Sequence, residues 1–374
     1  MNKKKIKVAI IGVGNCASSL VQGVSYYTIN SKNVSGLMMP SIGEYIPEDI
    51  EFSIAFDVDE RKVNTKISDA IFAKPNCAII LQKEIVNCPG MVYRSPTLDG
   101  ISNHMQEYPI DDTFKEDTSN EPLTAEQIKR KLKDLEVDIL INYLPVGSQL
   151  ATEFWAQIAI ETNISFLNCI PVFIASDPNW ARKFKESNTL IIGDDMKSEF
   201  GASIVSQVLQ ELAFSRGHKV KCHIQRNVGG NTDFLNMENK DRLFSKKISK
   251  ENVIRSQNDI RNISTEGSFL HAGPSEYIKF YGDNKIANFH IELEGFMGSP
   301  VILDAQLSVQ DSPNSAGVVI DAIRYLQVAK ELGLSGALKG ASAWTQKTPP
   351  VQLTADQALL ECQMLADRII PTLS

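Results

Sequence analysis

The chain has 374 residues, of which 43% are apolar and 22% are charged, and its formal net charge is −7. This composition is typical of a globular protein, and the length indicates about two domains of roughly 100–200 residues each. The negative charge argues against a nucleic-acid binder, which needs a large cationic surface, but it allows a locally basic pocket. The sequence has no long apolar run and no intact secretion signal, so we expect a cytoplasmic protein without membrane contact. The six cysteines are scattered and are expected to stay reduced.

The first half of the chain alternates short apolar strands with helical segments. Strands are expected at 7–14, 50–59, 137–148, 164–173 and 189–195, and helices at 17–26, 60–72, 149–162, 179–187 and 203–214. Almost continuously apolar strands that alternate with helices are typical of a doubly wound parallel sheet. We therefore predict an α/β fold with a Rossmann-type domain over 1–200, in which the polar segment 75–125 is an insertion.

The pattern changes after about residue 218. Longer strands, in which apolar and polar residues alternate as in an antiparallel sheet with one wet face, are expected at 219–230, 276–282, 285–295 and 301–311. We predict a second, α+β domain over 201–314 that contains a largely antiparallel sheet. A helical pattern over 315–333 then indicates that the C-terminal segment 315–374 returns to the first domain.

The segment "GVGNCA", residues 12–17, matches the G-x-G-x-x-A pattern of dinucleotide-binding turns between a strand and a helix. Gly12 permits the tight turn, Gly14 lets backbone N–H groups approach a pyrophosphate, and Ala17 allows close packing. Asp57 ends the second predicted strand, where it can accept hydrogen bonds from a ribose diol. No arginine directly follows Asp57, which favours NAD over NADP. The alternative is a glycine turn that binds no nucleotide.

Four lysines lie in predicted turns or loops. Lys197 follows Asp194 and Asp195 just after a predicted strand, where ligands of doubly wound sheets bind. The other three are Lys246, Lys285 (two residues after Asp283) and Lys347. From the residues alone, a lysine of this kind is more often a solvated surface side chain.

Two polar segments also resemble ligand-binding loops. In "NVGGNTDF", residues 227–234, Gly229, Gly230 and Asn231 are expected to cradle a phosphate through backbone donors, and a tight β-turn is the alternative. The segment "DSPNSAG" is either a similar ligand-binding loop or only the start of a helix that is capped by Ser315.

Eight segments occur in one order along the chain, namely "VGNCASSLVQG", "LPVGS", "PVFIASDPNWA", "GDDMKS", "NVGGNTDFLNM", "SKKISK", "DSPNSAGVVIDA" and "ASAWTQKTPP". Together they resemble the myo-inositol-1-phosphate synthase family, also called inositol-3-phosphate synthases, and especially its shorter bacterial and archaeal form. The resemblance runs from about residue 6 to 350 and is weakest over 75–125. It implies that Asn15 and Cys16 belong to this family's own version of the dinucleotide turn.

The resemblance implies an isomerase that converts glucose 6-phosphate into an inositol monophosphate, with NAD regenerated in each turnover. The C5 hydroxyl is oxidised, enolisation and an intramolecular aldol reaction close the ring, and the C5 ketone is reduced again. A cage of fixed cations suits the phosphate, enolate and alkoxide charges of such a reaction. By resemblance this cage comprises Lys197, Lys246, Lys285 and Lys347, with Asp283 orienting Lys285. The NAD site adds Asn142, Pro145, Asp194, Asp195 and Ser198 to the turn and Asp57.

The resemblance also implies a homotetramer, with the second domain's sheet in the subunit interface. The longer eukaryotic form has "KSGQTK" where this chain has "KSEFGAS", so of two lysines only Lys197 is retained. The lower positive charge leaves room for a divalent or monovalent cation, whose ligands stay unknown. Three alternatives stay open, namely a related cyclase acting on a different hexose phosphate, a plain NAD-dependent sugar or polyol dehydrogenase, and a non-catalytic NAD-binding sensor.

Overall fold

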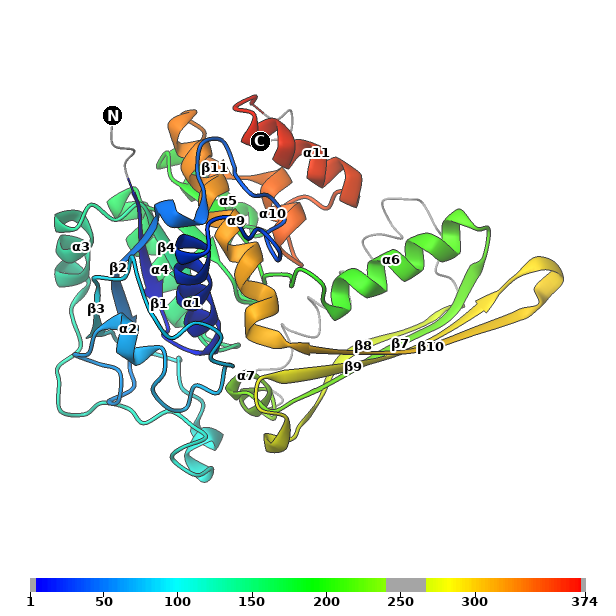
Figure 1. The fold of residues 1–374 in the computed structure, drawn as a ribbon, viewed down its shortest axis with the longest axis horizontal. Coiled ribbons are helices and arrows are strands. Elements are labelled where there is room, and N and C mark those ends of the chain that lie inside the picture. The colour runs from blue at the N-terminus through cyan, green and yellow to red at the C-terminus, as the bar shows by residue number, and fades with distance from the viewer. Residues whose placement is uncertain (1–4, 240–266, 371–374) are drawn as a thin grey trace.

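The structure is a computed structural model that describes residues 5–239 and 267–370 (Figure 1). It has a rounded body built on one sheet, and a second, longer sheet that projects from one side of that body. The junction between the two sheets is formed by segments that are distant in the sequence.

The body is built on a parallel sheet of seven strands in the order β11-β6-β5-β4-β1-β2-β3. Its strands are β1 (Ile6–Ile11), β2 (Ile50–Asp57), β3 (Met91–Arg94), β4 (Ile139–Asn142), β5 (Ser165–Asn168), β6 (Leu190–Ile192) and β11 (Gly336–Ala337). All neighbouring pairs are parallel. The first six strands have the order 3-2-1-4-5-6 of a Rossmann fold, which confirms the predicted fold class.

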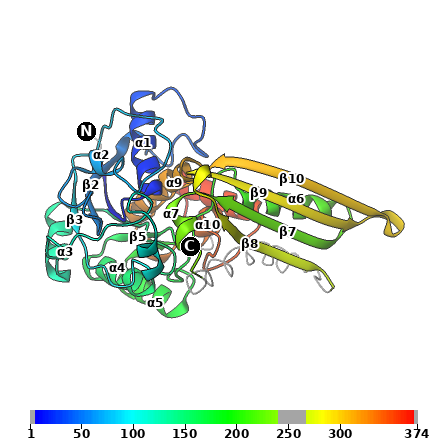
Figure 2. The same cartoon turned by 90° about the horizontal axis from the view of Figure 1, so that it is seen from below.

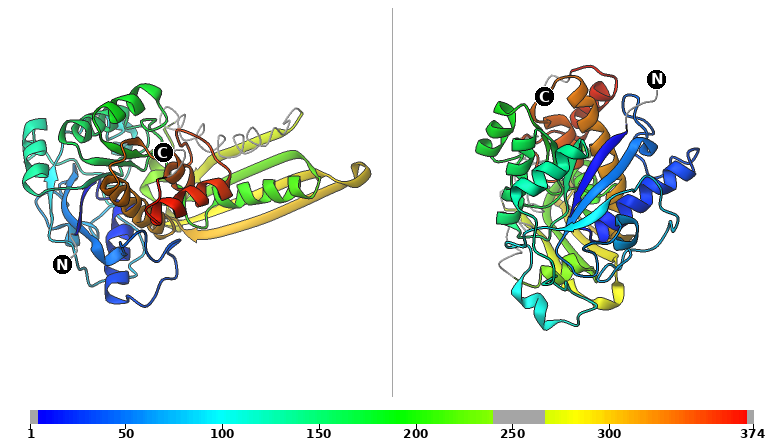
Figure 3. Two further views of the ribbon diagram at one scale, coloured as in Figure 1. Left: turned by 90° about the horizontal axis from the view of Figure 1, so that it is seen from above. Right: turned by 90° about the vertical axis from the view of Figure 1, so that its left-hand side faces the viewer.

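Helices cover both faces of this sheet, as Figure 3 shows. The body contains η1 (Pro47–Asp49), α2 (Ile67–Ala70), η2 (Asn103–Glu107), α3 (Ala125–Asp134), α4 (Gln149–Thr162) and α5 (Pro178–Glu186), besides α1 (Asn15–Ile29) and the C-terminal helices α9 (Asp311–Glu331), α10 (Lys339–Thr345) and α11 (Ala355–Ala366). Alternate residues of β1 face opposite cores, because side chains of a strand alternate between its faces. Val8 and Ile10 pack with α1 and α9, whereas Ala9 and Ile11 pack with α3, α4 and α5.

The projecting sheet has four strands in the order β10-β9-β7-β8 (Figure 2). They are β7 (Lys219–Gly229), β8 (Phe269–Tyr277), β9 (Asn284–Glu294) and β10 (Pro300–Gln310), with α6 (Ala202–Ser215), α7 (Thr232–Asn236), η3 (Lys279–Tyr281) and η4 (Phe296–Gly298). The β10–β9 and β9–β7 pairs are antiparallel and the β7–β8 pair is parallel. The prediction of a second, largely antiparallel sheet is therefore confirmed.

Four local predictions are wrong. The helix expected over 60–72 shrinks to α2, because Asn64 takes a left-handed backbone angle of 61° and the Asp59 carboxylate binds the backbone N–H groups of Arg61 and Lys115 instead. The segment expected as an insertion supplies β3, which is too short to give a periodic signal.

The third correction concerns the start of α9. This helix begins at Asp311, so Ser315 lies within its first turns rather than at its cap, and the Ser315 hydroxyl donates to the carbonyl of Ser312. The strand expected at 276–282 ends at Tyr277 and is followed by η3. The domain boundaries near 200 and 314 stay predictions.

One buried arginine fastens α9 to the N-terminal part of the body. Arg324 has no exposed surface, and its guanidinium donates to the carbonyls of Met39 (2.8 Å), Pro40 (3.1 Å) and Tyr45 (3.3 Å) and pairs with Asp321. These carbonyls belong to the loop between α1 and β2. The charge is therefore both neutralised and fully hydrogen-bonded, as a buried charge must be.

We expect Arg324→Met to lower the free energy of unfolding by about 3–5 kcal/mol, since it removes the ion-pair partner of the buried Asp321 carboxylate and the hydrogen bonds to three carbonyls. Chemical denaturation measures the change. Arg182→Met, at an exposed position of α5, is the matched control and is expected to change stability by less than about 0.5 kcal/mol. Equal effects of the two substitutions would contradict the role assigned to Arg324.

Candidate active site

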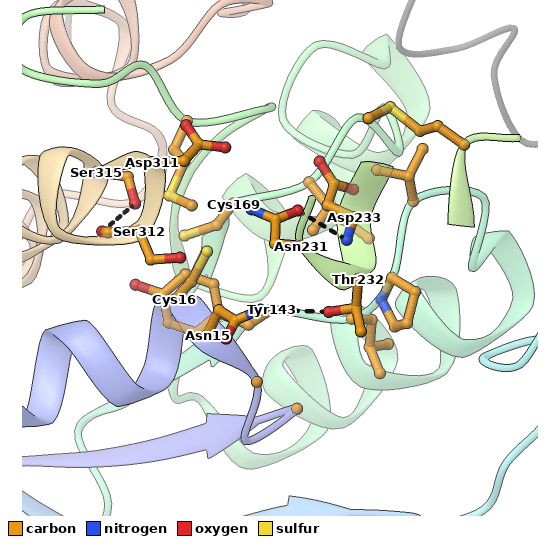
Figure 4. Close-up of a pocket in the computed structure, with 18 of the residues that line it drawn as sticks. Asn15, Cys16, Tyr143, Cys169, Asn231, Thr232, Asp233, Asp311, Ser312 and Ser315 are labelled. Atoms are coloured by element: carbon orange, nitrogen blue, oxygen red, sulfur yellow. Dashed lines mark hydrogen bonds between the residues drawn. The ribbon is translucent and has the colours of Figure 1, made fainter. Parts of the chain in front are cut away.

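A large cleft lies at the junction of the two sheets, beside the carboxyl ends of β1, β2, β4 and β6 (Figure 4). It spans about 1620 Å³, including space open to solvent. The predicted site residues on its wall are Gly12, Gly14, Asn15, Cys16, Asp57, Pro145, Asp195, Ser198, Asn231, Lys285 and Lys347.

The glycine turn forms one end of the cleft. Gly12 has a φ of +88°, and a Cβ there would lie 2.8 Å from the Tyr143 carbonyl oxygen, so only glycine fits. A Cβ on Gly14 would instead meet no atom within 4 Å. Gly14 is the N-cap of α1 and no side chain caps this helix, so the N–H groups of its first turn are available to an anion. This geometry fits the pyrophosphate of a dinucleotide.

Asp57 and Asn15 fix the shape of the turn. Asp57 Oδ2 accepts the Val13 N–H at 2.6 Å, and Asp57 also lines the cleft. Asn15 Oδ1 accepts the N–H groups of Cys77 (2.7 Å) and Ala78 (2.9 Å), and its amide nitrogen donates to Thr232. Asn15 therefore ties the turn to the segment after β2 and to α7, a role that its position in the glycine motif did not reveal.

Two lysines with carboxylate partners form the other end of the cleft. Lys347 Nζ donates to Asp195 Oδ1 at 3.0 Å, and Lys285 pairs with Asp311 at the start of α9. The side chains of Lys285 and Lys347 are 16% and 13% exposed, so each cation is largely withdrawn from water but still reaches the cleft. Both lysines were predicted, whereas Asp311 was missed because its partner is distant in the sequence.

Lys197 lies behind the wall rather than on it. Its Nζ donates to the Ala343 carbonyl at 2.7 Å, and the residue is only 7% exposed. Burial, together with the nearby charge of Lys347, lowers the pKa of Lys197 to about 8. The neighbouring residues Met196 and Ser198 do line the cleft. A lysine with this pKa can hold or release a proton near neutral pH.

Asn142 and Asp194 are also buried behind the wall. The Asn142 amide donates to Thr152 (3.2 Å) and to Asn168 (2.9 Å). Asp194 accepts hydrogen bonds from the side chains of Asn168 and Ser176, and burial raises its pKa to about 6. Three further donors to the Asp194 carboxylate are the backbone N–H groups of residues 174–176. Both residues thus organise the strand ends that carry the cleft.

The predicted pairing of Asp283 with Lys285 is wrong. Asp283 accepts hydrogen bonds from the Asn231 amide (3.0 Å) and from the backbone and hydroxyl of Ser312 (3.1 and 2.7 Å). Burial and the charge of Asp311 raise the pKa of Asp283 to about 6. Asp283 is therefore a link between α7 and α9, and it does not line the cleft.

Only Asn231 of the predicted phosphate cradle reaches the cleft wall. Its Oδ1 accepts the Asp233 N–H at 3.1 Å and caps α7. A Cβ on Gly230 would lie 2.4 Å from the Ile278 carbonyl oxygen, so this glycine is required by close packing. Gly229 and Gly230, like Ala17, lie off the wall, and Lys246 falls outside the described residues.

A chain of hydrogen bonds connects a buried histidine to the cleft wall. Gln210 donates to His223 Nδ1 (2.8 Å), so the imidazole proton is on Nε2, which donates to the Ser206 hydroxyl (3.1 Å). Ser206 donates to Gln225 (2.8 Å), whose amide donates to Asn227 (3.0 Å). Gln225 and Asn227 line the cleft. The neutral imidazole therefore fixes which way these two amides point.

His223 makes the fold sensitive to acid. Burial lowers its pKa from 6.5 to about 4, so between these values the unfolded chain binds a proton that the folded chain rejects. The stabilisation is complete above pH 6.5 and is lost as the pH falls to about 4. We expect this single group to reduce the free energy of unfolding by about 3 kcal/mol between pH 7 and pH 4.

Denaturation of the wild type and His223→Gln across this pH range measures that contribution, and the variant is expected to show a flatter profile. His218→Gln, at a partly exposed position, is the matched control and is expected to keep the wild-type profile. An unchanged slope in His223→Gln would show that His223 is not the titrating group.

Two kinds of feature are absent from the described residues. Within 5–239 and 267–370, no group of three or more histidine, cysteine, aspartate or glutamate side chains is arranged to hold a metal ion. In the same part of the chain, every helix is too short or too polar to cross a membrane.

The six-strand order, the uncapped glycine turn and the acidic end of β2 define a protein with a Rossmann-type fold, and its second sheet borders the cleft. A family model described as myo-inositol-1-phosphate synthase matches residues 201–312. The chain is 46% identical over 356 residues to an inositol-3-phosphate synthase of Mycobacterium tuberculosis, covering 95% of this chain and 94% of that protein. It is 44% identical over 367 residues to that of Mycolicibacterium smegmatis, covering 96% and 97%. The chain therefore belongs to the inositol-3-phosphate synthase family.

The fold is also shared with a solved structure. A myo-inositol-1-phosphate synthase-related protein from Thermotoga maritima superposes with a TM-score of 0.80 over 98% of this chain and 100% of that chain, at 23% identity. The likeness at this identity concerns the fold alone, including the projecting sheet.

Proposed function

We propose that this protein is an inositol-3-phosphate synthase, an isomerase that cyclises D-glucose 6-phosphate to 1D-myo-inositol 3-phosphate with NAD as a recycled cofactor. The observation that carries the proposal is the cleft itself. One end presents a bare helix N-terminus, and the other end, formed by segments from both halves of the chain, presents two largely buried lysines. The family membership of the chain supports the same activity.

The residues of the cleft suit the charges of this reaction. The first turn of α1 would bind the cofactor pyrophosphate, and Asp57 retains acceptor capacity for a ribose hydroxyl. NAD, when bound, supplies an oxidant that takes a hydride from the substrate and returns it later. Lys285 and Lys347 would bind the oxygens on which negative charge develops, in an environment where water screens them little. Lys197, with a pKa of about 8, is placed behind Lys347, where it adds to the positive potential while protonated.

The substrate phosphate is assigned to the part of the cleft between α7 and α9. Asn231 offers an amide there, and Ser312 and Ser315 line the same wall near Asp311 (Figure 4), the carboxylate that pairs with Lys285. We retain Gly229 and Gly230 only as the close-packed support of this wall. A divalent or monovalent cation that adds positive charge would be detected as a loss of activity after dialysis against EDTA or exchange of the monovalent salt.

The first test is incubation of the protein with NAD and glucose 6-phosphate, followed by measurement of both the sugar products and the NADH absorbance. We expect inositol monophosphate without accumulation of NADH, since the hydride is returned within each turnover. Accumulating NADH with an oxidised sugar would instead identify a dehydrogenase. Turnover only with another hexose phosphate would identify a related cyclase, and NAD binding without any turnover would identify a sensor.

We expect Lys285→Met and Lys347→Met each to lower kcat about 10²–10³-fold, the usual effect of removing one fixed stabiliser of transition-state charge. Initial rates of inositol phosphate formation measure the loss, and circular dichroism checks that the variants fold. Lys133→Met, at an exposed position of α3, is the matched control and is expected to keep wild-type rates. Full activity of either cleft variant would remove that lysine from the mechanism.

A homotetramer in the cytoplasm is the assembly and location that we propose. Most β10 positions are exposed, including Val301 and Ile302 at 40% and 60%, although this strand is eleven residues long. An unpaired apolar edge of this length is normally covered by another chain. Light scattering of the purified protein is expected to give four times the mass of 41.4 kDa, and Ile302→Lys is expected to lower it. A monomeric wild type would contradict this proposal.

A further inference from the structure

Val13, the middle residue of the glycine turn, makes hydrogen bonds through both its N–H group and its carbonyl. The Val13 N–H donates to Asp57 Oδ2 at 2.6 Å. The Val13 carbonyl accepts two hydrogen bonds, from Lys62 Nζ at 2.8 Å and from the Asn76 amide at 3.1 Å. Lys62 Nζ also donates to Asn76 Oδ1 at 3.0 Å, so the two side chains that bind the carbonyl also bind each other.

The hold on the Val13 carbonyl sets the direction of the next N–H group. The Val13–Gly14 peptide is trans, and in a trans peptide the carbonyl and the following N–H point in opposite directions. A carbonyl that points at Lys62 therefore turns the Gly14 N–H away from Lys62. This N–H then joins the N–H groups of the first turn of α1, which no side chain caps.

Burying Lys62 at this position costs free energy. It is completely buried, and burial lowers its pKa, although the neighbouring carboxylates of Asp57 and Asp59 favour its charged form. A buried ammonium costs free energy unless its hydrogen bonds are satisfied. The Lys62 ammonium donates to the Val13 carbonyl, which is part of the turn, and to Asn76, which binds the same carbonyl, and Lys62 also borders the cleft.

We propose that Lys62 is a positioning residue for the cofactor pyrophosphate. By holding the Val13 carbonyl, it directs the Gly14 N–H at the phosphate oxygens, and its ammonium adds a fixed positive charge beneath the turn. This inference rests on the proposed dinucleotide site. Two roles are thus distinguished at the acidic end of β2. Asp57 fixes the Val13 N–H and is available to the ribose. Lys62 and Asn76 fix the Val13 carbonyl and thereby position the turn for the pyrophosphate.

The test compares ligands that share the adenosine group but differ in the pyrophosphate. Dissociation constants of NAD, ADP and adenosine are measured for the wild type and for Lys62→Met by calorimetry or ligand-observed NMR. We expect Lys62→Met to weaken NAD and ADP about tenfold or more, because the turn loses hydrogen bonds to a charged group, and to change adenosine binding less than about twofold. A merely structural role would weaken all three ligands alike.

Two further variants keep the test decisive. Asn76→Ala removes part of the hold on Val13 without changing the charge, and it is expected to show the same ligand pattern with a smaller loss, even if Lys62→Met fails to fold. Lys66→Met, at an exposed position nearby, is the charge-matched control and is expected to bind all three ligands like the wild type.

The outcomes distinguish the two proposals. Equal losses for the three ligands, or unchanged binding of NAD and ADP, in Lys62→Met and Asn76→Ala would overturn the role of Lys62 while leaving the dinucleotide site intact. A wild-type protein that binds neither NAD nor ADP would overturn the dinucleotide site, and the role of Lys62 with it.

Discussion

The cleft depends on the hydrogen bonds of one buried carboxylate. Asp283, just before β9, accepts from Asn231 at the start of α7 and from Ser312 at the start of α9. These three segments belong to the projecting sheet and to the helix that carries the chain back to the body. Because donors from both segments point at one carboxylate, a shift of either segment would leave a buried charge with fewer hydrogen bonds. The position of Lys285, two residues after Asp283, is fixed by the same contacts.

The lysines of the cleft lie next to carboxylates, which balance their positive charge. Lys285 and Lys347 each have a carboxylate partner, and the ammonium of Lys62 lies near Asp57 and Asp59. Three buried cations without partners would destabilise the folded state before any ligand arrived. An anionic ligand that enters the cleft can compete for the same lysines. The arrangement thus keeps the empty site stable and still leaves it attractive to phosphate.

The features that could be predicted from the sequence are local ones. The glycine turn could be predicted because its functional residues lie within a few positions of one another. Asp57 could be predicted because it ends an apolar strand. Lys285 and Lys347 came from the family resemblance. Lys62 was missed because it lay inside a predicted helix that the structure replaces with turns, and its acceptors are far along the chain. Asn142 and Asp194 were expected to contact the cofactor. The structure places them at strand ends, but their side chains face inward. A strand period gives the position of a side chain but not its partners.

The route of the chain through the parallel sheet orders the appearance of the site during synthesis. The glycine turn and Asp57 emerge from the ribosome first and can fold with β1 and β2 at an early stage. The far end of the cleft needs Asp311, which follows the last strand of the projecting sheet, and Lys347, which follows β11 beside β6. An incomplete nascent chain therefore carries the glycine turn and Asp57 long before it carries the lysines proposed to act on a sugar phosphate.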